Sequence, residues 1–200
     1  MSNSNEIIMQ LSAKLSLAVK AVLKKFSIEH PNDTMYAFAL VAPPEGTYIS
    51  CAIATEQTLD RVVKSYGEMG YVAKSGDTLA MLRQELRWAN PDDGWYNYSF
   101  PENESILLEL EQAFNSKRIE NFDGTTEAIC TDALKKLDLE HVFGCGEDRN
   151  NLAISFTYGE DPEDFLKFSE KLNAPTIVQR IRQELTDSYK VAAQMNTPYD

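Results

Sequence analysis

The sequence predicts a single α+β domain over residues 1–200, built from a mainly antiparallel sheet and about six helices. A chain of 200 residues has the length of one medium-sized domain, and its 43% hydrophobic and 25% charged residues are ordinary globular values. Two short apolar segments separated by Pro43-Pro44-Glu45-Gly46 are typical of a β-hairpin. Several other segments repeat apolar residues every three or four positions, which predicts helices. We expect these helices to pack mainly on one face of the sheet.

The first helix is predicted by an apolar stripe that runs from Ile7 to Phe26. Lys24 and Lys25 suit the negative end of the helix dipole, and Pro31-Asn32-Asp33 predicts where the helix ends. We interpret the stripe as a face that packs on the core. A helix lying on a membrane surface would need a strongly basic polar face, and the rest of this chain is acidic.

The sheet is predicted from three parts of the chain. The hairpin lies near residues 35–54, and a further strand near 95–100 is indicated by aromatic residues that alternate with polar ones. A continuous apolar run predicts the last strand near 152–158. The remaining helices are expected over about 56–66 after a Thr55 cap, around 106–114 with Phe114 facing inward, from Thr125 or Thr126, after Asp161, and from Pro175. After Asp77 we expect either a helix or an extended stretch.

The net charge of −12 is concentrated in one part of the chain. Residues 91–173 hold seven basic and nineteen acidic residues and so carry the whole excess, whereas residues 1–31 carry +2. Such a field repels nucleic-acid phosphates and anionic membranes, so we expect neither as a partner. It attracts a basic protein and raises the encounter rate. The acidity therefore has two interpretations, which are solubility alone and a surface that faces a basic partner.

Residues 87–100 form an unusual aromatic segment around the turn sequence Asn-Pro-Asp-Asp-Gly. Its rings are either ordinary core, with Arg87 reaching outward, or exposed anchors, because Trp, Tyr and Arg dominate binding hot spots. A stack of Arg87 on Trp88 in a pocket is a third interpretation. We expect Trp88 in the core and leave Trp95 and Tyr96 open, because so polar a turn favours a place near the surface.

Motifs that carry catalysis are missing from the sequence. It contains no GxSxG, no GxxxxGK[ST] and no GxGxxG after a strand, and His30 and His141 fit plain positions at helix ends. We expect no cofactor and no metal, since the acids between 160 and 164 are already explained as a helix start. An odd count of three cysteines without an export signal is typical of free thiols in a reducing compartment, which predicts a cytoplasmic protein.

The order of these features carries a family resemblance. An amphipathic helix is followed by Tyr36-Ala37-Phe38-Ala39-Leu40, by a strand that ends before Thr55-Glu56, and by Leu86-Arg87-Trp88 with a turn to Trp95-Tyr96. In this order nearly the whole chain resembles the bacterial domain of unknown function family 4303, with the Arg-Trp…Trp-Tyr element as its distinctive part. The resemblance brings no catalytic residues. It implies an association with toxins, because small acidic cytoplasmic proteins of this kind often occur near contact-dependent toxins, where some act as immunity proteins.

Together these observations predict a non-enzymatic module that binds and neutralises a more basic protein, such as a nuclease toxin domain. Aromatic anchors would supply affinity, and carboxylates would supply rate and selectivity. The expected partner-binding residues are Asp92, Asp93, Trp95, Tyr96, Glu102, Glu104, Glu109, Glu147 and Asp148. One alternative is an enzyme that uses carboxylates or a metal. A deep pocket lined by two or more of Asp92, Asp93, Glu147, Asp148 and Tyr96 would favour it. Another is a small-ligand or scaffold protein.

Overall fold

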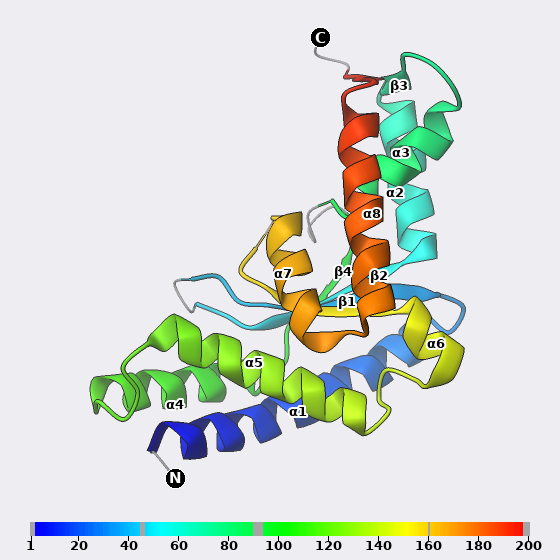
Figure 1. The fold of residues 1–200 in the computed structure, drawn as a ribbon. Helices are drawn as coiled ribbons and strands as arrows, with labels where there is room; N and C mark the ends of the chain where they lie inside the picture. Colours follow the sequence, from blue (N-terminus) through cyan, green and yellow to red (C-terminus); the bar gives the residue numbers. More distant parts are fainter. Residues whose placement is uncertain (1–2, 45–46, 90–93, 160, 198–200) are drawn as a thin grey trace.

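A computed structural model describes residues 3–44, 47–89, 94–159 and 161–197 (Figure 1). The helices are α1 (Asn3–Glu29), α2 (Glu56–Glu68), α3 (Thr78–Leu86), α4 (Asn103–Asn115), α5 (Phe122–Leu139), α6 (Gly146–Asn151), α7 (Pro162–Leu172) and α8 (Pro175–Ala192). The strands are β1 (Met35–Val41), β2 (Ser50–Thr55), β3 (Val72–Ala73), β4 (Tyr96–Tyr98), β5 (Ala153–Thr157) and β6 (Met195–Asn196). This composition of helices and strands confirms the α+β class.

The main sheet has four strands in the order β4-β2-β1-β5. Strands β1 and β2 form the expected antiparallel hairpin, with Phe38 opposite Ile53, and β4 adds to β2 in the antiparallel sense. Strand β5 lies where the apolar run near 152–158 predicted a strand, but it pairs parallel to β1, with Phe38 opposite Ile154. The sheet is therefore mixed. Strands β3 and β6 form a separate pair that the sequence did not predict.

Helices cover both faces of the sheet, so the expectation that they pack mainly on one face is wrong. In Figure 1, α1, α4 and α5 lie below the sheet, and α2, α3 and α8 rise above it. The reason is the composition of β1, whose side chains are apolar on both faces of the sheet. Phe38 and Leu40 point into one core, and Ala37 and Ala39 point into the other. A strand that is apolar in both phases is buried on both sides.

The two cores are named here by the face that they occupy. The first-face core contains Phe38, Leu40, Ile53 and the buried side of α1, α4 and α5. The second-face core contains the alanines of β1 and β2, both tryptophans and the buried side of α2, α3 and α8. Helix α7 lies beside β5 and contributes Phe168 to the first-face core and Phe165 to the second-face core.

Helices α2, α3, α5 and α7 begin at local capping signals that the sequence contains. Thr55 caps α2, Asp77 caps α3 and Asp161 caps α7, where its carboxylate accepts a hydrogen bond from the Glu163 backbone N–H at 2.9 Å. Helix α5 begins at Phe122, earlier than predicted, because the Asn121 side chain accepts from the Gly124 N–H at 2.9 Å. Within the described part of the chain, no helix is long and apolar enough to cross a membrane.

Helix α6 is an unpredicted element, since the glycines around Cys145 indicate a turn. Its Arg149 side chain is only 13% exposed and makes a two-pronged ion pair with Asp138 of α5, with Nε 2.5 Å from Oδ1. The same guanidinium donates to the carbonyls of Leu152 and Leu172 at 2.7 and 3.2 Å. Arg149 therefore fixes α6 to α5, β5 and the end of α7.

Candidate partner-binding surface

The two tryptophans of the aromatic segment lie in the second-face core. Trp88 is 5% exposed, which confirms the core interpretation, and Trp95 is 7% exposed, which favours the core over the surface-anchor interpretation that the sequence left open. Both rings pack on Phe165, with centroids 5.3 and 6.0 Å apart. The physical reason is space, because the alanines of β1 and β2 leave room for large rings above this face of the sheet.

Arg87 does not reach outward from the segment. Its guanidinium lies 4.1 Å above the Tyr36 ring, with Nη2 3.0 Å from Glu56 Oε1 and Nε 3.3 Å from Glu184 Oε2. The Trp88 indole N–H also donates to Glu184, at 2.8 Å. The Arg-Trp element therefore joins α3 to α2 and α8, and its contacts serve the fold.

Tyr96 is partly exposed at the β4 edge of the sheet, where its hydroxyl is already engaged. The hydroxyl donates to Asp33 Oδ2 at 3.0 Å and accepts from Arg61 Nη2 at 3.1 Å. The His30 ring lies against the Tyr96 ring with centroids 4.0 Å apart. Tyr96 thus belongs to a fixed polar cluster, and its contact with a partner stays a prediction.

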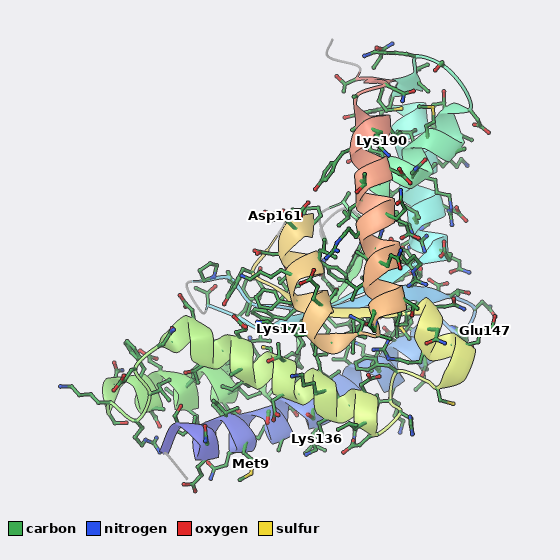
Figure 2. The ribbon with its side chains drawn as sticks, in the orientation of Figure 1. Met9, Lys136, Glu147, Asp161, Lys171 and Lys190 are labelled. Carbon is green, nitrogen blue, oxygen red and sulfur yellow. The ribbon has the colours of Figure 1, made fainter. Side chains whose placement is uncertain are left out.

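The acidic residues expected to bind a partner do not form one surface. Glu102 and Glu104 are exposed at the start of α4, and Glu147 and Asp148 are exposed in α6. Helices α4 and α6 lie at opposite ends of the molecule (Figure 1), and Glu147 is labelled at the α6 end in Figure 2. A partner that covers one of these acidic pairs would not reach the other in the same orientation.

The remaining expected acids contribute less to a free surface. Asp92 and Asp93 lie outside the described residues. Glu109 is paired with Lys14 of α1, with 2.5 Å between Nζ and Oε1. Its charge is therefore partly neutralised within the chain.

A run of exposed and unpaired negative charge lies on α4 and the first turns of α5, a segment called the acidic arm here (residues 102–127). It contains seven acidic and two basic residues. Five of its carboxylates are exposed and form no ion pair with any described residue: Glu102, Glu104, Glu111, Glu120 and Asp123. Several of them stand near helix N-termini, where the helix dipole stabilises negative charge. Figure 1 shows the arm extending beyond one end of the sheet.

Exposed apolar side chains accompany these charges on α4. Glu104, Leu108 and Glu111 are spaced by four and three residues and so share one face of the helix. Leu108 is 54% exposed. Phe114 is 42% exposed and packs edge-on against Phe122, with ring centroids 5.9 Å apart. Apolar groups surrounded by carboxylates form the mixed surface that protein interfaces use.

Phe114 is a surface residue that the sequence reasoning missed, because we expected it to face inward. The helix instead buries Ile106, Leu110 and Ala113, which recur at steps of four and three. Ala113 was the signal in the sequence that could have shown this. It completes the buried stripe, and the next residue, Phe114, then falls on the side of the helix that faces solvent.

Three cavities in the described part of the chain bear on the alternative of a carboxylate enzyme. Glu147, Asp148 and Tyr96 do not line these three cavities. No group of three or more His, Cys, Asp or Glu among the described residues is arranged to hold a metal ion. The cavity next to Trp95 has room for about one water molecule, near an indole N–H that has no hydrogen-bond partner among the described residues.

The three cysteines are free. Cys51 and Cys130 are buried in the first-face core, and desolvation raises the pKa of both thiols. A thiol held in its protonated form is a poor nucleophile. Cys145, in contrast, is exposed before α6.

Comparison with known proteins gives one match. The family model described as a domain of unknown function (DUF4303) matches residues 15–174. No curated protein and no solved structure matches the chain significantly.

Proposed function

Since the chain belongs to the DUF4303 family of domains of unknown function, we propose from its own residues that it is a non-enzymatic protein-binding module. In this proposal it is a bacterial immunity protein that acts in the cytoplasm. It binds a cognate basic toxin domain, such as a nuclease, and covers the surface with which the toxin would act. An exposed free thiol at Cys145 suits a reducing compartment.

The observation that carries the proposal is the acidic arm. Its five exposed and unpaired carboxylates supply a field that draws a basic protein toward α4 and α5. Leu108 and Phe114 supply apolar area on the same helix, and buried apolar anchors provide most of the affinity in such interfaces. The arm replaces the aromatic segment as the proposed docking surface.

Charge reversal on the arm tests the proposal. The variant Glu104→Lys/Glu111→Lys should slow association with the captured basic partner by about tenfold at low salt and flatten the salt dependence of the association rate. The matched control is Glu147→Lys/Asp148→Lys, which changes the net charge equally at the α6 end. The control should slow association much less, because steering weakens with distance in salt. The measurement is biosensor association kinetics with the purified partner at several salt concentrations.

Three outcomes would contradict the proposal. Equal slowing by both variants would mean that net charge, and not the arm, controls the encounter. Unchanged kinetics in both variants would remove the electrostatic basis altogether. A partner that binds well but keeps its toxic activity in the complex would contradict neutralisation while leaving the binding surface in place.

A further inference from the structure

We propose that a groove at the C-terminal end of α1 binds a small organic anion that has an apolar body and a single negative charge, such as a carboxylate or sulfonate. The groove has a volume of about 490 Å³ and is formed by the last turns of α1, the segment that leads into β1, and Val142 after α5. This volume is typical of small-molecule sites. The groove and the acidic arm are separate, because α1 runs from beside α4 toward α6 (Figure 1).

The charged wall of the groove comes from α1. Lys20 and Lys24 both line it. Lys20 is paired with Glu140, with 2.5 Å between Nζ and Oε2, whereas Lys24 is exposed and forms no ion pair with any described residue. The Lys24 ammonium offers an anionic group a direct partner.

His30 forms a second polar part of the wall, and its ring is held in place. The imidazole packs against both Phe26 and Tyr96, with ring centroids 5.2 and 4.0 Å away. Tyr96 is itself fixed by hydrogen bonds to Asp33 and Arg61. The His30 ring nitrogens make no hydrogen bond with any described residue. A rigid ring with a free N–H is a preorganised donor, which lowers the entropic cost of binding.

The floor of the groove is apolar. Leu23, Phe26, Met35 and Val142 line it, and Phe26 is only 3% exposed. This floor requires a ligand with hydrocarbon or aromatic surface, since bare inorganic anions would gain nothing from it.

Asp33 limits the charge that the ligand can carry. It lines the same groove, and its Oδ2 accepts hydrogen bonds from the hydroxyls of Thr55 and Tyr96 at 3.1 and 3.0 Å. A carboxylate at this place repels polyphosphates more strongly than it repels a monoanion. The combined chemistry therefore selects one negative charge on an apolar body.

The test uses 8-anilinonaphthalene-1-sulfonate, a monoanionic aromatic probe whose fluorescence rises in apolar sites. Titration of the full chain should show one saturable site. Lys24→Glu should weaken binding by about tenfold because attraction becomes repulsion, and His30→Gln should weaken it by about threefold through loss of the fixed donor. The control Lys64→Glu makes the same charge change at an exposed position of α2 and should leave the affinity within twofold of the original.

Circular dichroism first confirms that each variant is folded. Nile red, which is apolar but neutral, should not compete for the site. The proposal is overturned if Lys24→Glu binds the probe as the original chain does, if Lys64→Glu weakens binding equally, or if Nile red displaces the probe with similar affinity. The proposed interaction with a toxin is independent of each of these results.

Discussion

Glu85 on α3 is a side chain whose ionisation opposes folding. Its Oε2 is buried without a hydrogen-bond partner among the described residues, and desolvation raises its pKa. The folded chain therefore holds the Glu85 proton more tightly than the unfolded chain does. Ionisation of Glu85 at neutral pH therefore lowers the free energy of unfolding. This penalty vanishes when the pH falls below the pKa that Glu85 has in the unfolded chain.

The variant Glu85→Gln should accordingly raise the unfolding temperature at pH 7, and the gain should shrink toward zero near pH 4. The physical reason is that glutamine removes the desolvated charge and keeps the shape of the side chain. Glu111→Gln, on the exposed face of α4, makes the same change in net charge and serves as the control. Thermal unfolding at both pH values measures the effect, and a gain at pH 4 as large as at pH 7 would contradict the assigned cause.

Single side chains also show where reasoning from sequence fails. The polar turn before Trp95 favoured exposure, yet the ring is buried because of residues far away in the chain. Ala37 and Ala39 alternate with Phe38 and Leu40, so one face of the hairpin carries only small side chains at these positions. The sequence therefore indicated space above this face, but only the fold shows that Trp95 is one of the rings that fill it.

At the scale of elements, Arg87 joins three helices that are distant in sequence. It pairs with Glu56 at the start of α2 and Glu184 in α8, and its guanidinium stacks on Tyr36. Lysine offers neither the planar stack nor two parallel N–H donors. The Arg-Trp element is therefore expected to depend on arginine and not on positive charge alone.

The variant Arg87→Lys should lower the free energy of unfolding by about 1–3 kcal/mol, because part of the half-buried network loses its partners. Arg182→Lys is the matched control, since Arg182 forms an exposed ion pair with Glu170, and it should stay within about 0.5 kcal/mol of the original chain. Urea denaturation measures both variants. A loss of the same size in both would mean that Arg87 acts only as a surface cation.

Elements differ in how far local sequence determines them. Helices α2 and α7 were predicted together with their caps, because a capping residue acts on the next few backbone groups. Asp77 left a helix and an extended stretch open, and the structure shows the helix α3. Helix α6 was missed because it depends on the Arg149 contact with Asp138, and β3 was missed because its partner β6 lies near the other end of the chain. Long-range contacts of this kind leave little local trace.

For the whole molecule, charge was predictable from sequence and its placement was not. The excess of acids over residues 91–173 indicated an acidic surface. The separation of α4 from α6 follows from the path of the chain through α5, which runs from beside α4 toward α6 (Figure 1). Composition and spacing carry no information on the distance between α4 and α6. The acids that were predicted to form one surface therefore lie on two.

The single-domain prediction has a direct test in this architecture, because the two cores share one sheet and the tryptophans report on the second-face core alone. Trp88 and Trp95 are the only tryptophans, and both lie in the second-face core. Far-UV circular dichroism reports on the helices of both faces. If the chain is one domain, tryptophan fluorescence and circular dichroism should show the same urea midpoint.

A substitution in the opposite core sharpens this test. Ile129 of α5 is buried in the first-face core, away from both tryptophans. Ile129→Ala should lower the free energy of unfolding by about 2–5 kcal/mol and should shift the fluorescence and circular dichroism midpoints equally, because loss of packing on one face destabilises the shared sheet. Ile181→Ala in the second-face core is the matched variant. A fluorescence midpoint that follows Ile181→Ala but ignores Ile129→Ala would show that the two faces unfold separately, so that the chain is not one cooperative unit.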